Sequence, residues 1–450
     1  MIPLQTDLAA VVEGVNLVWV LTVTFLIFFM HAGFAMLEAG QVRSKNVANQ
    51  LTKNLLTWSV GVVVYFLLGA AASTIVGGLT GGGSVSVGGA FADLYAPEAT
   101  SAWVDWLFGA VFAMTAATIV SGAVAGRARL RAYVAYTVLL AGVIYPVVVG
   151  FTWAGGFLGA MGFHDFAGGV IVHGMGGVAG LTAAWVIGPR MDRYNADGSA
   201  NVIPGHSMTF AVLGTLILAF GWYGFNVGTA ASPLALTESG EVTLGAFTYV
   251  GRVALVTTLG MAAGAIGAAG MAVYRTGKVD TLYVANGLLA GLVGVTSIAD
   301  AIVWPGAIVV GLLCGVQLPL VFSFVEKRLK IDDVCAVFPV HGSAGVLGAL
   351  LYPVFATGVW SGSASVVGAA VPQIVGVAVI GVWTFAATAA VFGVFRATGQ
   401  ARVTREHERE GLDTSEHGVD TCPEFGRPES DAGVRADGGV FTEAEREEYP

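Results

Sequence analysis

The stretch Asp165-Phe-Ala-Gly-Gly-Val-Ile-Val-His-Gly-Met-Gly-Gly-Val-Ala-Gly180 is echoed by Asp333-Val-Cys-Ala-Val-Phe-Pro-Val-His-Gly-Ser-Ala-Gly-Val-Leu-Gly348. In each copy a histidine follows the aspartate by eight residues and begins the pattern His-Gly-x-x-Gly-Val-x-Gly. Both copies lie in apolar runs long enough to cross a hydrocarbon core about 30 Å thick. An ionisable side chain repeated at this depth indicates a duplicated functional position, because such residues are costly inside a membrane.

The composition around this repeat is that of a membrane protein. Of 450 residues, 55% are hydrophobic and 11% are charged, whereas soluble domains carry about 25% charged residues. Many of the 64 glycines lie inside apolar runs, which favours helices packed through small faces, as in Gly287-x3-Gly291-x2-Gly294. The sequence predicts an all-α polytopic protein with eleven transmembrane helices, near residues 15–39, 52–76, 103–125, 131–151, 166–188, 207–229, 246–273, 279–299, 302–325, 334–355 and 371–396.

The basic residues predict the orientation in the membrane, because Lys and Arg are enriched in cytoplasmic loops. Of the 21 Lys and Arg, 13 fall in alternate loops or span ends and 7 lie from Arg396 onward, leaving Arg252 as the exception. We therefore expect the N-terminus outside and the C-terminus inside. The 13 are Arg43, Lys45, Lys53, Arg127, Arg129, Arg131, Arg190, Arg193, Arg275, Lys278, Lys327, Arg328 and Lys330.

The two copies of the motif are predicted to cross the membrane in opposite directions. They lie in spans five and ten, so the chain forms an inverted five-plus-five repeat followed by one extra C-terminal helix. Such repeats place functional sites near the bilayer midplane. Eight residues of helix rise about 12 Å, so we expect His173 and His341 to meet there from opposite faces.

Charge also divides the chain into segments. The net charge is −9, and residues after 400 contribute 14 Asp or Glu against 6 Arg. We expect an extracellular N-terminal segment at 1–14, a transmembrane domain at 15–396 and a cytoplasmic acidic tail at 397–450. The N-terminal segment contains no Lys or Arg, unlike a secretory signal peptide. The nearly neutral body and acidic tail argue against nucleic-acid binding.

The histidine pair suits a small hydrogen-bonding solute. A neutral imidazole donates from one nitrogen and accepts at the other, so two adjacent rings can share a proton and still face a passing molecule. Taken singly, each histidine would more often be a packed, hydrogen-bonded side chain, and only the repeat-related pair favours a functional role. A metal site would need a third ligand, and Cys314, Cys335 and Cys422 have no metal-type spacing. We expect neither a metal nor a cofactor.

An aromatic set is expected toward the outer side of the same spans. Aromatic faces bind cations, and a hydroxyl can add a hydrogen bond; the alternative is a set of core or lipid-belt aromatics. Asp165 is expected to cap span five or to favour cations at the outer mouth. Glu38 and Asp300 have no assigned role beyond capping or packing. The set comprises Phe108, Phe112, Trp153, Trp222, Phe225 and Thr229.

Together these residues resemble the ammonium transporter family, within the ammonium transporter, methylamine permease and Rhesus group. The resemblance covers residues 15–420, and Trp153 with the tail 408–413 is similar to the bacterial and archaeal branch. The motifs are Ala32-Gly-Phe-Ala-Met-Leu-Glu-Ala-Gly-Gln-Val-Arg-Ser-Lys-Asn46, Asp165-Phe-Ala-Gly-Gly169, Gly221-Trp-Tyr-Gly-Phe-Asn-Val-Gly228, Gly291-Leu-Val-Gly-Val-Thr296 and Val340-His-Gly342.

The resemblance implies a multi-pass cell-membrane transporter that acts as a homotrimer, each subunit with its own pore. Ammonium would be deprotonated outside and conducted as ammonia past twin histidines, His173 and His341, and a PII-type signalling protein would bind the cytoplasmic face. The implied residues are Phe112, Trp153, Phe225 and Thr229 for ammonium recruitment, Phe112 and Phe225 for the gate, and Asp165, Phe108 and Trp222 for support of the outer site.

Three positions and the tail depart from the family pattern. Thr229 replaces a common serine but keeps the hydroxyl, His31 stands where glutamine is frequent, and Ala336 replaces a common aspartate ahead of the second histidine motif. Residues 421–450 are acidic and Gly-containing, a composition typical of disorder. Two other functions stay open: an ammonium sensor that signals through its tail, and a Rhesus-like gas channel. An enzyme is not expected, because no nucleophile and base pair is apparent.

Overall fold

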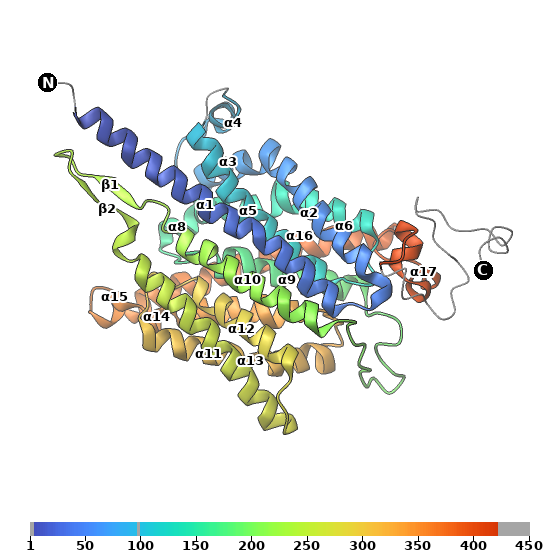
Figure 1. Cartoon of the computed structure of the whole chain (residues 1–450). Helices are drawn as coiled ribbons and strands as arrows, with labels where there is room; N and C mark the ends of the chain where they lie inside the picture. Colours follow the sequence, from blue (N-terminus) through green and yellow to red (C-terminus); the bar gives the residue numbers. More distant parts are fainter. Residues whose placement is uncertain (1–3, 97–99, 422–450) are drawn as a thin grey trace, which may run out of the picture.

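The computed structural model describes residues 4–96 and 100–421. The chain forms a bundle of long helices that run along one common axis (Figure 1). Its helices are α1 Leu4–Gln41, α2 Val47–Val64, α3 Ala70–Thr80, α4 Val87–Tyr95, α5 Thr100–Ala123, α6 Leu130–Leu139, α7 Tyr145–Phe151, α8 Phe157–Met161, α9 Met175–Ile187, α10 Met208–Gly228, α11 Val250–Thr276, α12 Thr281–Thr296, α13 Trp304–Phe324, α14 Ala344–Phe355, α15 Thr357–Trp360, α16 Val366–Ala397 and α17 Arg405–Glu410.

The helices have the lengths that a membrane protein needs. Within the described residues, ten helical stretches of at least 18 residues are apolar enough to cross a bilayer. A shorter apolar helix, Thr281–Thr296, falls on the predicted span 279–299. The prediction of an all-α polytopic membrane fold is therefore confirmed, with ten to eleven apolar helices in the described residues. The first helix begins at Leu4, well before the predicted start at residue 15, so its N-terminal turns continue the span.

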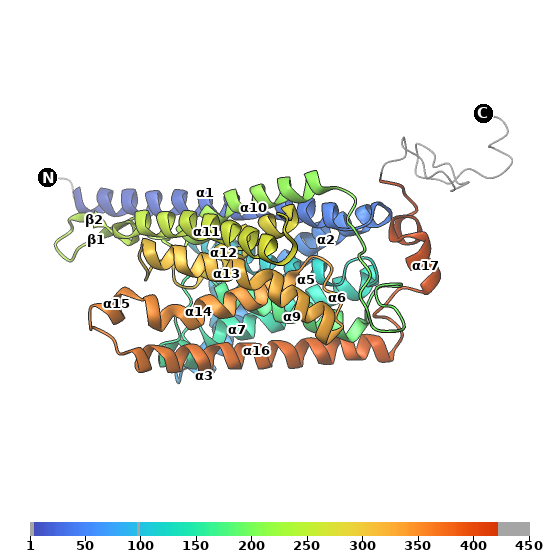
Figure 2. The same cartoon turned by 90° about the horizontal axis from the view of Figure 1, so that it is seen from below.

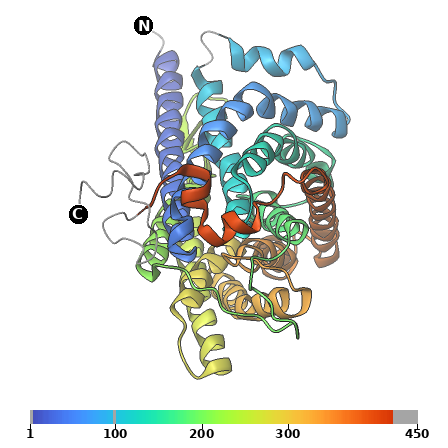
Figure 3. The same cartoon turned by 90° about the vertical axis from the view of Figure 1, so that its right-hand side faces the viewer.

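The two ends of the described chain lie at opposite ends of the bundle. Helix α1 begins at one end, whereas α17 lies at the other (Figure 2). Figure 3 looks at the bundle from the α17 end, where the segment after α16 crosses over the ends of other helices. A two-stranded antiparallel sheet, β1 Leu234–Leu236 with β2 Val242–Leu244, lies at the end where α1 begins (Figure 1). Which end faces the cytoplasm stays a prediction.

Both histidine motifs lie where the helical geometry changes. A π-helical segment, η4 Gly169–Gly174, precedes α9 and contains His173, and a second one, η7 Phe338–Ser343, precedes α14 and contains His341. From these segments α9 extends toward the α17 end of the bundle and α14 toward the opposite end (Figures 1 and 2). Because π-helical turns occur often at functional sites, the fold points to the region of the bundle where the two segments lie.

Close helix packing depends on glycine on the side of the bundle formed by α11, α12 and α13. A Cβ added to Gly291 on α12 would lie 2.2 Å from the carbonyl oxygen of Gly260 on α11. On the other side of the same contact, a Cβ at Gly264 would lie 2.3 Å from the carbonyl oxygen of Gly287. Backbone therefore meets backbone at this crossing, as small residues allow between membrane helices.

We predict that Gly291→Ala lowers the free energy of unfolding by about 1–3 kcal/mol, because the methyl group forces α11 and α12 apart. Thermal unfolding of the protein in detergent would measure the effect. Gly270→Ala is the matched control on α11, since nothing lies within 4 Å of its added Cβ. Equal stability of the two variants would contradict this account of the packing.

Candidate pore site

The two repeated histidines face one another in the centre of the bundle. The Nδ1 atom of His173 lies 3.2 Å from Nδ1 of His341, and the rings are stacked with centroids 5.3 Å apart at 14°. Their exposed fractions are 0% and 5%. The expectation that the motif copies bring two imidazoles together from separate segments is confirmed.

Glycines of the two motifs make this approach possible. A Cβ on Gly177 would lie 2.2 Å from the backbone nitrogen of Gly342, and one on Gly345 would lie 2.0 Å from the carbonyl oxygen of Gly169. Any larger residue would push the two backbones apart. The glycines of the repeated pattern therefore hold the segments close enough for the imidazole–imidazole hydrogen bond.

That hydrogen bond sets the chemistry of the outward-facing nitrogens. In a neutral pair only one of the two facing Nδ1 atoms carries the shared proton. The other ring then carries its proton on Nε2, so one free Nε2 donates and the other accepts. The Nε2 atom of His173 is buried and has no hydrogen-bond partner among the described residues. A buried polar nitrogen without a partner is costly, and a passing polar solute would satisfy it.

Trp222 forms one wall of the histidine site. Its indole stacks on His173 with centroids 4.7 Å apart at 15°, and its Nε1 donates to Thr296 Oγ1 at 2.9 Å. Both Trp222 and Thr296 are fully buried. The sequence placed Trp222 with the outer aromatics, but it did not reveal that the indole lies directly against the histidine. Thr296 belonged to a recognised motif, although its contact with Trp222 had no signal in the sequence.

Two phenylalanines cover the histidine pair on one side. The rings of Phe112 and Phe225 lie with centroids 4.2 Å apart, and Phe225 is 5.2 Å from His173. Both phenylalanines are buried, with 3% and 0% exposure. Phe108 contacts Phe112 at 4.9 Å. Two buried rings therefore lie between the exposed Trp153 and the ring of His173.

Beyond this pair lies a more exposed aromatic and hydroxyl group. The indole of Trp153 meets Phe112 edge-on with centroids 5.9 Å apart, and the residue is 42% exposed. Its Nε1 donates to the carbonyl oxygen of Asp165 at 2.8 Å. Thr229 Oγ1 donates to the carbonyl oxygen of Phe225 at 2.9 Å. Because that bond uses the hydroxyl hydrogen, the lone pairs of Thr229 stay available to accept from a cation.

Asp165 ties the loop after Trp153 to the first histidine segment. Its Oδ1 accepts from the amides of Gly168 and Gly169 at 2.9 and 2.8 Å, and its Oδ2 accepts from Val170 and Ile171 at 2.9 and 2.7 Å. The expectation that it caps span five is confirmed. Burial raises the pKa of this carboxyl group, and the amide hydrogen bonds act in the opposite direction.

Two of the three positions that depart from the family pattern are His31 and Ala336. His31 is buried against Trp58, with ring centroids 5.2 Å apart, and neither of its nitrogens has a hydrogen-bond partner among the described residues. Ala336 adopts a φ of 55° and lines a vestibule at the α17 end, together with Asp333 and Asn286. Nothing in the structure explains why histidine stands at position 31.

The fold and this site define a class of membrane transport protein. Apolar helices surround the buried Nε2 of His173, which has no hydrogen-bond partner in the part of the chain that the structure describes, and aromatic rings pack against this histidine. The profile of the Ammonium Transporter Family matches residues 18–421, and the chain belongs to that family. The expected absence of an enzymatic activity agrees with this membership.

Relatives match over nearly the whole chain. Ammonium transporter Amt2 of Haloferax mediterranei is 80% identical over 437 residues, covering 97% of this chain and 96% of that protein. Ammonium transporter Amt1 of the same organism is 54% identical over 454 residues, covering 98% and 86%.

Solved structures share the fold. A structure described as "Sensor Amt Protein" has a TM-score of 0.81 at 30% identity and covers 91% of this chain and 100% of that chain. The crystal structure of Candida albicans Mep2 has a TM-score of 0.73 at 24% identity, with 87% of both chains covered; at that identity it supports the fold alone.

We predict that Asp165→Ala lowers the free energy of unfolding by about 1–3 kcal/mol, because it leaves buried amides without an acceptor. Thermal unfolding in detergent would measure the change. Asp197→Ala is the control, since this exposed carboxylate accepts hydrogen bonds only from Ser199 among the described residues. A loss no larger than that of the control would mean that the cap is not structural.

Proposed function

We propose that the protein transports ammonium across the cell membrane through the pore that contains His173 and His341. The observation that carries this proposal is the buried Nε2 of His173, which has no protein partner among the described residues and belongs to a ring that Phe225 contacts. Membership of the Ammonium Transporter Family and the names of the Haloferax relatives support the substrate.

The outer residues act in sequence. Ammonium is recruited by the exposed ring of Trp153, by Phe112 and Phe225, and by the hydroxyl of Thr229. Phe112 and Phe225 form the gate, whereas Asp165, Phe108 and Trp222 hold this outer site in place. This assignment is supported by the ring contacts around Phe112 and by the free lone pairs of Thr229.

Desolvation decides the transported form. A bare ammonium ion loses its water at the gate, and burying an isolated charge in an apolar passage is very costly. Leaving one proton behind converts the ion to ammonia. The free imidazole nitrogens can accept a hydrogen bond from ammonia or donate one to it. The hydrogen-bonded histidine pair relays that proton separately, so that each ammonia crosses together with one charge.

We further propose that the N-terminus faces outside, that the subunits form a homotrimer and that a PII-type signalling protein binds the cytoplasmic face. The distribution of Lys and Arg supports the orientation. The resemblance to the family supports the trimer and the partner.

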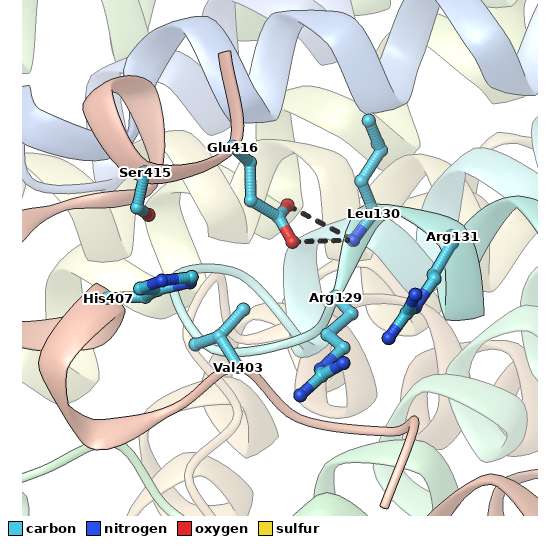
Figure 4. A pocket seen from close by; sticks show the side chains of 7 residues that line it. All are labelled: Arg129, Leu130, Arg131, Val403, His407, Ser415 and Glu416. Atoms are coloured by element: carbon cyan, nitrogen blue, oxygen red, sulfur yellow. Dashed lines mark hydrogen bonds between the residues drawn. The ribbon is translucent and has the colours of Figure 1, made fainter. Parts of the chain in front are cut away.

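The segment after α16 is the part of the chain that a cytoplasmic partner would meet. At the pocket in Figure 4, the carboxylate of Glu416 accepts from the amide of Leu130 at 3.1 Å, at the start of α6. Asp413 Oδ1 accepts from the amide of Asn49 at 2.9 Å, near the start of α2. The acidic segment is therefore bonded to two spans of the bundle. The predicted disorder of residues 421–450 falls, apart from Thr421, outside the described residues.

These tail contacts keep a second candidate function open. A sensor would need a route from the ammonium site to a cytoplasmic segment, and the bonds of Asp413 and Glu416 to α2 and α6 supply one. The structural similarity to a protein titled as a sensor agrees with this possibility. Uptake of labelled methylammonium by cells that express the chain would separate the functions, since a non-transporting sensor would show none. No observation favours a Rhesus-like gas channel.

We predict that the double substitution His173→Ala and His341→Ala reduces selective uptake of labelled methylammonium at least about a hundredfold, because the passage loses its polar lining. Uptake by cells would be compared at equal amounts of membrane protein. His206→Ala is the control, since His206 is exposed and its ring lies 3.2 Å from the carbonyl oxygen of Val42, outside the pore. Undiminished, selective uptake by the double variant would refute the role of the pair.

We also predict that ammonia flux in proteoliposomes is accompanied by charge movement, because the histidine pair returns the proton removed at the gate. Current on a supported membrane and flux would be recorded on the same preparation. Robust flux without current would contradict the relay while leaving ammonia transport intact.

A further inference from the structure

His164 lies in the loop between α8 and η4, directly before Asp165 in the chain. Its imidazole stacks on Tyr352 of α14, with ring centroids 4.4 Å apart at 18°. Its Nε2 lies 3.0 Å from Oδ1 of Asp300, which belongs to the turn after α12, and the two side chains are 26% and 23% exposed. The transport scheme above uses neither residue, although they form an ion pair whenever the imidazole is protonated.

The backbone of His164 is held as well as its ring. Its amide donates to Gln373 Oε1 at 2.7 Å, and its carbonyl oxygen accepts from Gln373 Nε2 at 2.8 Å. Gln373 on α16 is fully buried, and its Nε2 also donates to the carbonyl oxygen of Ala349 on α14 at 3.1 Å. The start of α16 and the far end of α14 lie where α1 begins (Figure 2), which is the proposed outer end. Residue 164 therefore attaches the loop to three parts of the bundle.

This attachment helps to place Trp153 of the outer site. Asp165 follows His164, and its carbonyl oxygen accepts from Trp153 Nε1 at 2.8 Å. On the other side of Asp165, the amide of Phe166 donates to the carbonyl oxygen of Ser297 at 2.9 Å. The carbonyl that orients the indole thus lies between two attachment points. Only the point at His164 contains an imidazole, the side chain that as a class changes charge between about pH 5 and 8.

Protonation of the imidazole strengthens its contact with Asp300. The Nε2–H group donates to the carboxylate in both states, and the imidazolium adds the attraction of opposite charges. In a partly exposed pair this attraction stabilises the contact by a factor of up to about five. The other titratable groups around the pair are of types that ordinarily do not titrate near pH 6 to 8. They are Tyr352, Tyr249, Arg252 and Asp165.

A neutral imidazole has a second, opposite effect. It leaves the charge of Asp300 uncompensated by its one ion-pair partner among the described residues, and a negative charge at the outer end attracts cations. Both side chains reach solvent, where salt screens charges over about 8–10 Å. The attraction of a passing cation is therefore weak, and the attachment of the loop outweighs it.

We propose that His164 is a positioning residue of the outer site and that its protonation couples ammonium recruitment to the external pH. The inference rests on the recruitment residues and the orientation proposed above. At acidic external pH the ion pair with Asp300 holds the loop, and Trp153 stays against Phe112. At alkaline pH a neutral imidazole holds the loop less firmly, so the apparent KM for the cation rises.

The test is the apparent KM for labelled methylammonium in proteoliposomes, measured from about pH 5.5 to about pH 8 with the same pH on both sides. Methylammonium stays protonated throughout. For the unmodified protein we expect KM to rise about two- to fivefold with pH. His164→Gln keeps a hydrogen-bond donor for Asp300 but cannot take up a proton, so its KM is expected to stay at the alkaline value. Thermal unfolding in detergent would confirm that the variant is folded.

Asp300→Asn is a second variant, which leaves the imidazolium without its ion-pair partner and is expected to remove the pH dependence of KM. Glu241→Gln is the matched control, since it neutralises an exposed residue of the hairpin at the same end of the bundle and is expected to keep the dependence (Figure 1).

Four outcomes would overturn the role of His164 alone: a KM of the unmodified protein that is constant, a KM that falls with rising pH, a dependence that persists in His164→Gln or Asp300→Asn, and a dependence that is lost in Glu241→Gln. Absence of methylammonium uptake by the unmodified protein would instead overturn the proposed function, and this inference with it.

Discussion

The hydrogen bond between two buried imidazoles is the constraint on which the rest of this structure depends. It requires two chain segments to meet backbone to backbone in the middle of an apolar bundle, and glycine supplies the space, as at Gly177 against Gly342. It also requires each segment to change its helical geometry there, which the π-helical segments η4 and η7 provide. A single shared proton then leaves one free nitrogen that donates and one that accepts.

The remainder of the passage is shaped by the cost of moving a charge out of water. Phe112 and Phe225 cover one side of the pair, and burying an isolated charge behind them would be very costly. Among the described residues, the polar groups near the pair include the hydroxyl of Thr229 on the phenylalanine side and Glu38 with Asn286 in the cavity that His341 also lines.

The α17 end couples the pore to the acidic segment of the chain. The donors that hold Glu38 come from α2 and α5, and α2 also carries Lys53. Near its start, the same α2 donates to Asp413, and Glu416 is among the charges that attract Lys53. Helix α2 is therefore hydrogen-bonded both to the acidic segment and to Glu38.

The sequence by itself determined the fold class, the eleven apolar runs, the histidine pair and the cap at Asp165. Each of these follows from local composition, from a repeat or from a known motif. Only the tertiary structure decided which side chains meet: the indole of Trp222 on His173, the π-helical geometry of both motifs, and the place of Glu38 beside His341. Glu38 and His341 are about 300 residues apart, and no periodicity links them. Such contacts arise from the packing of α1 against segments of the second repeat, which local pattern does not encode.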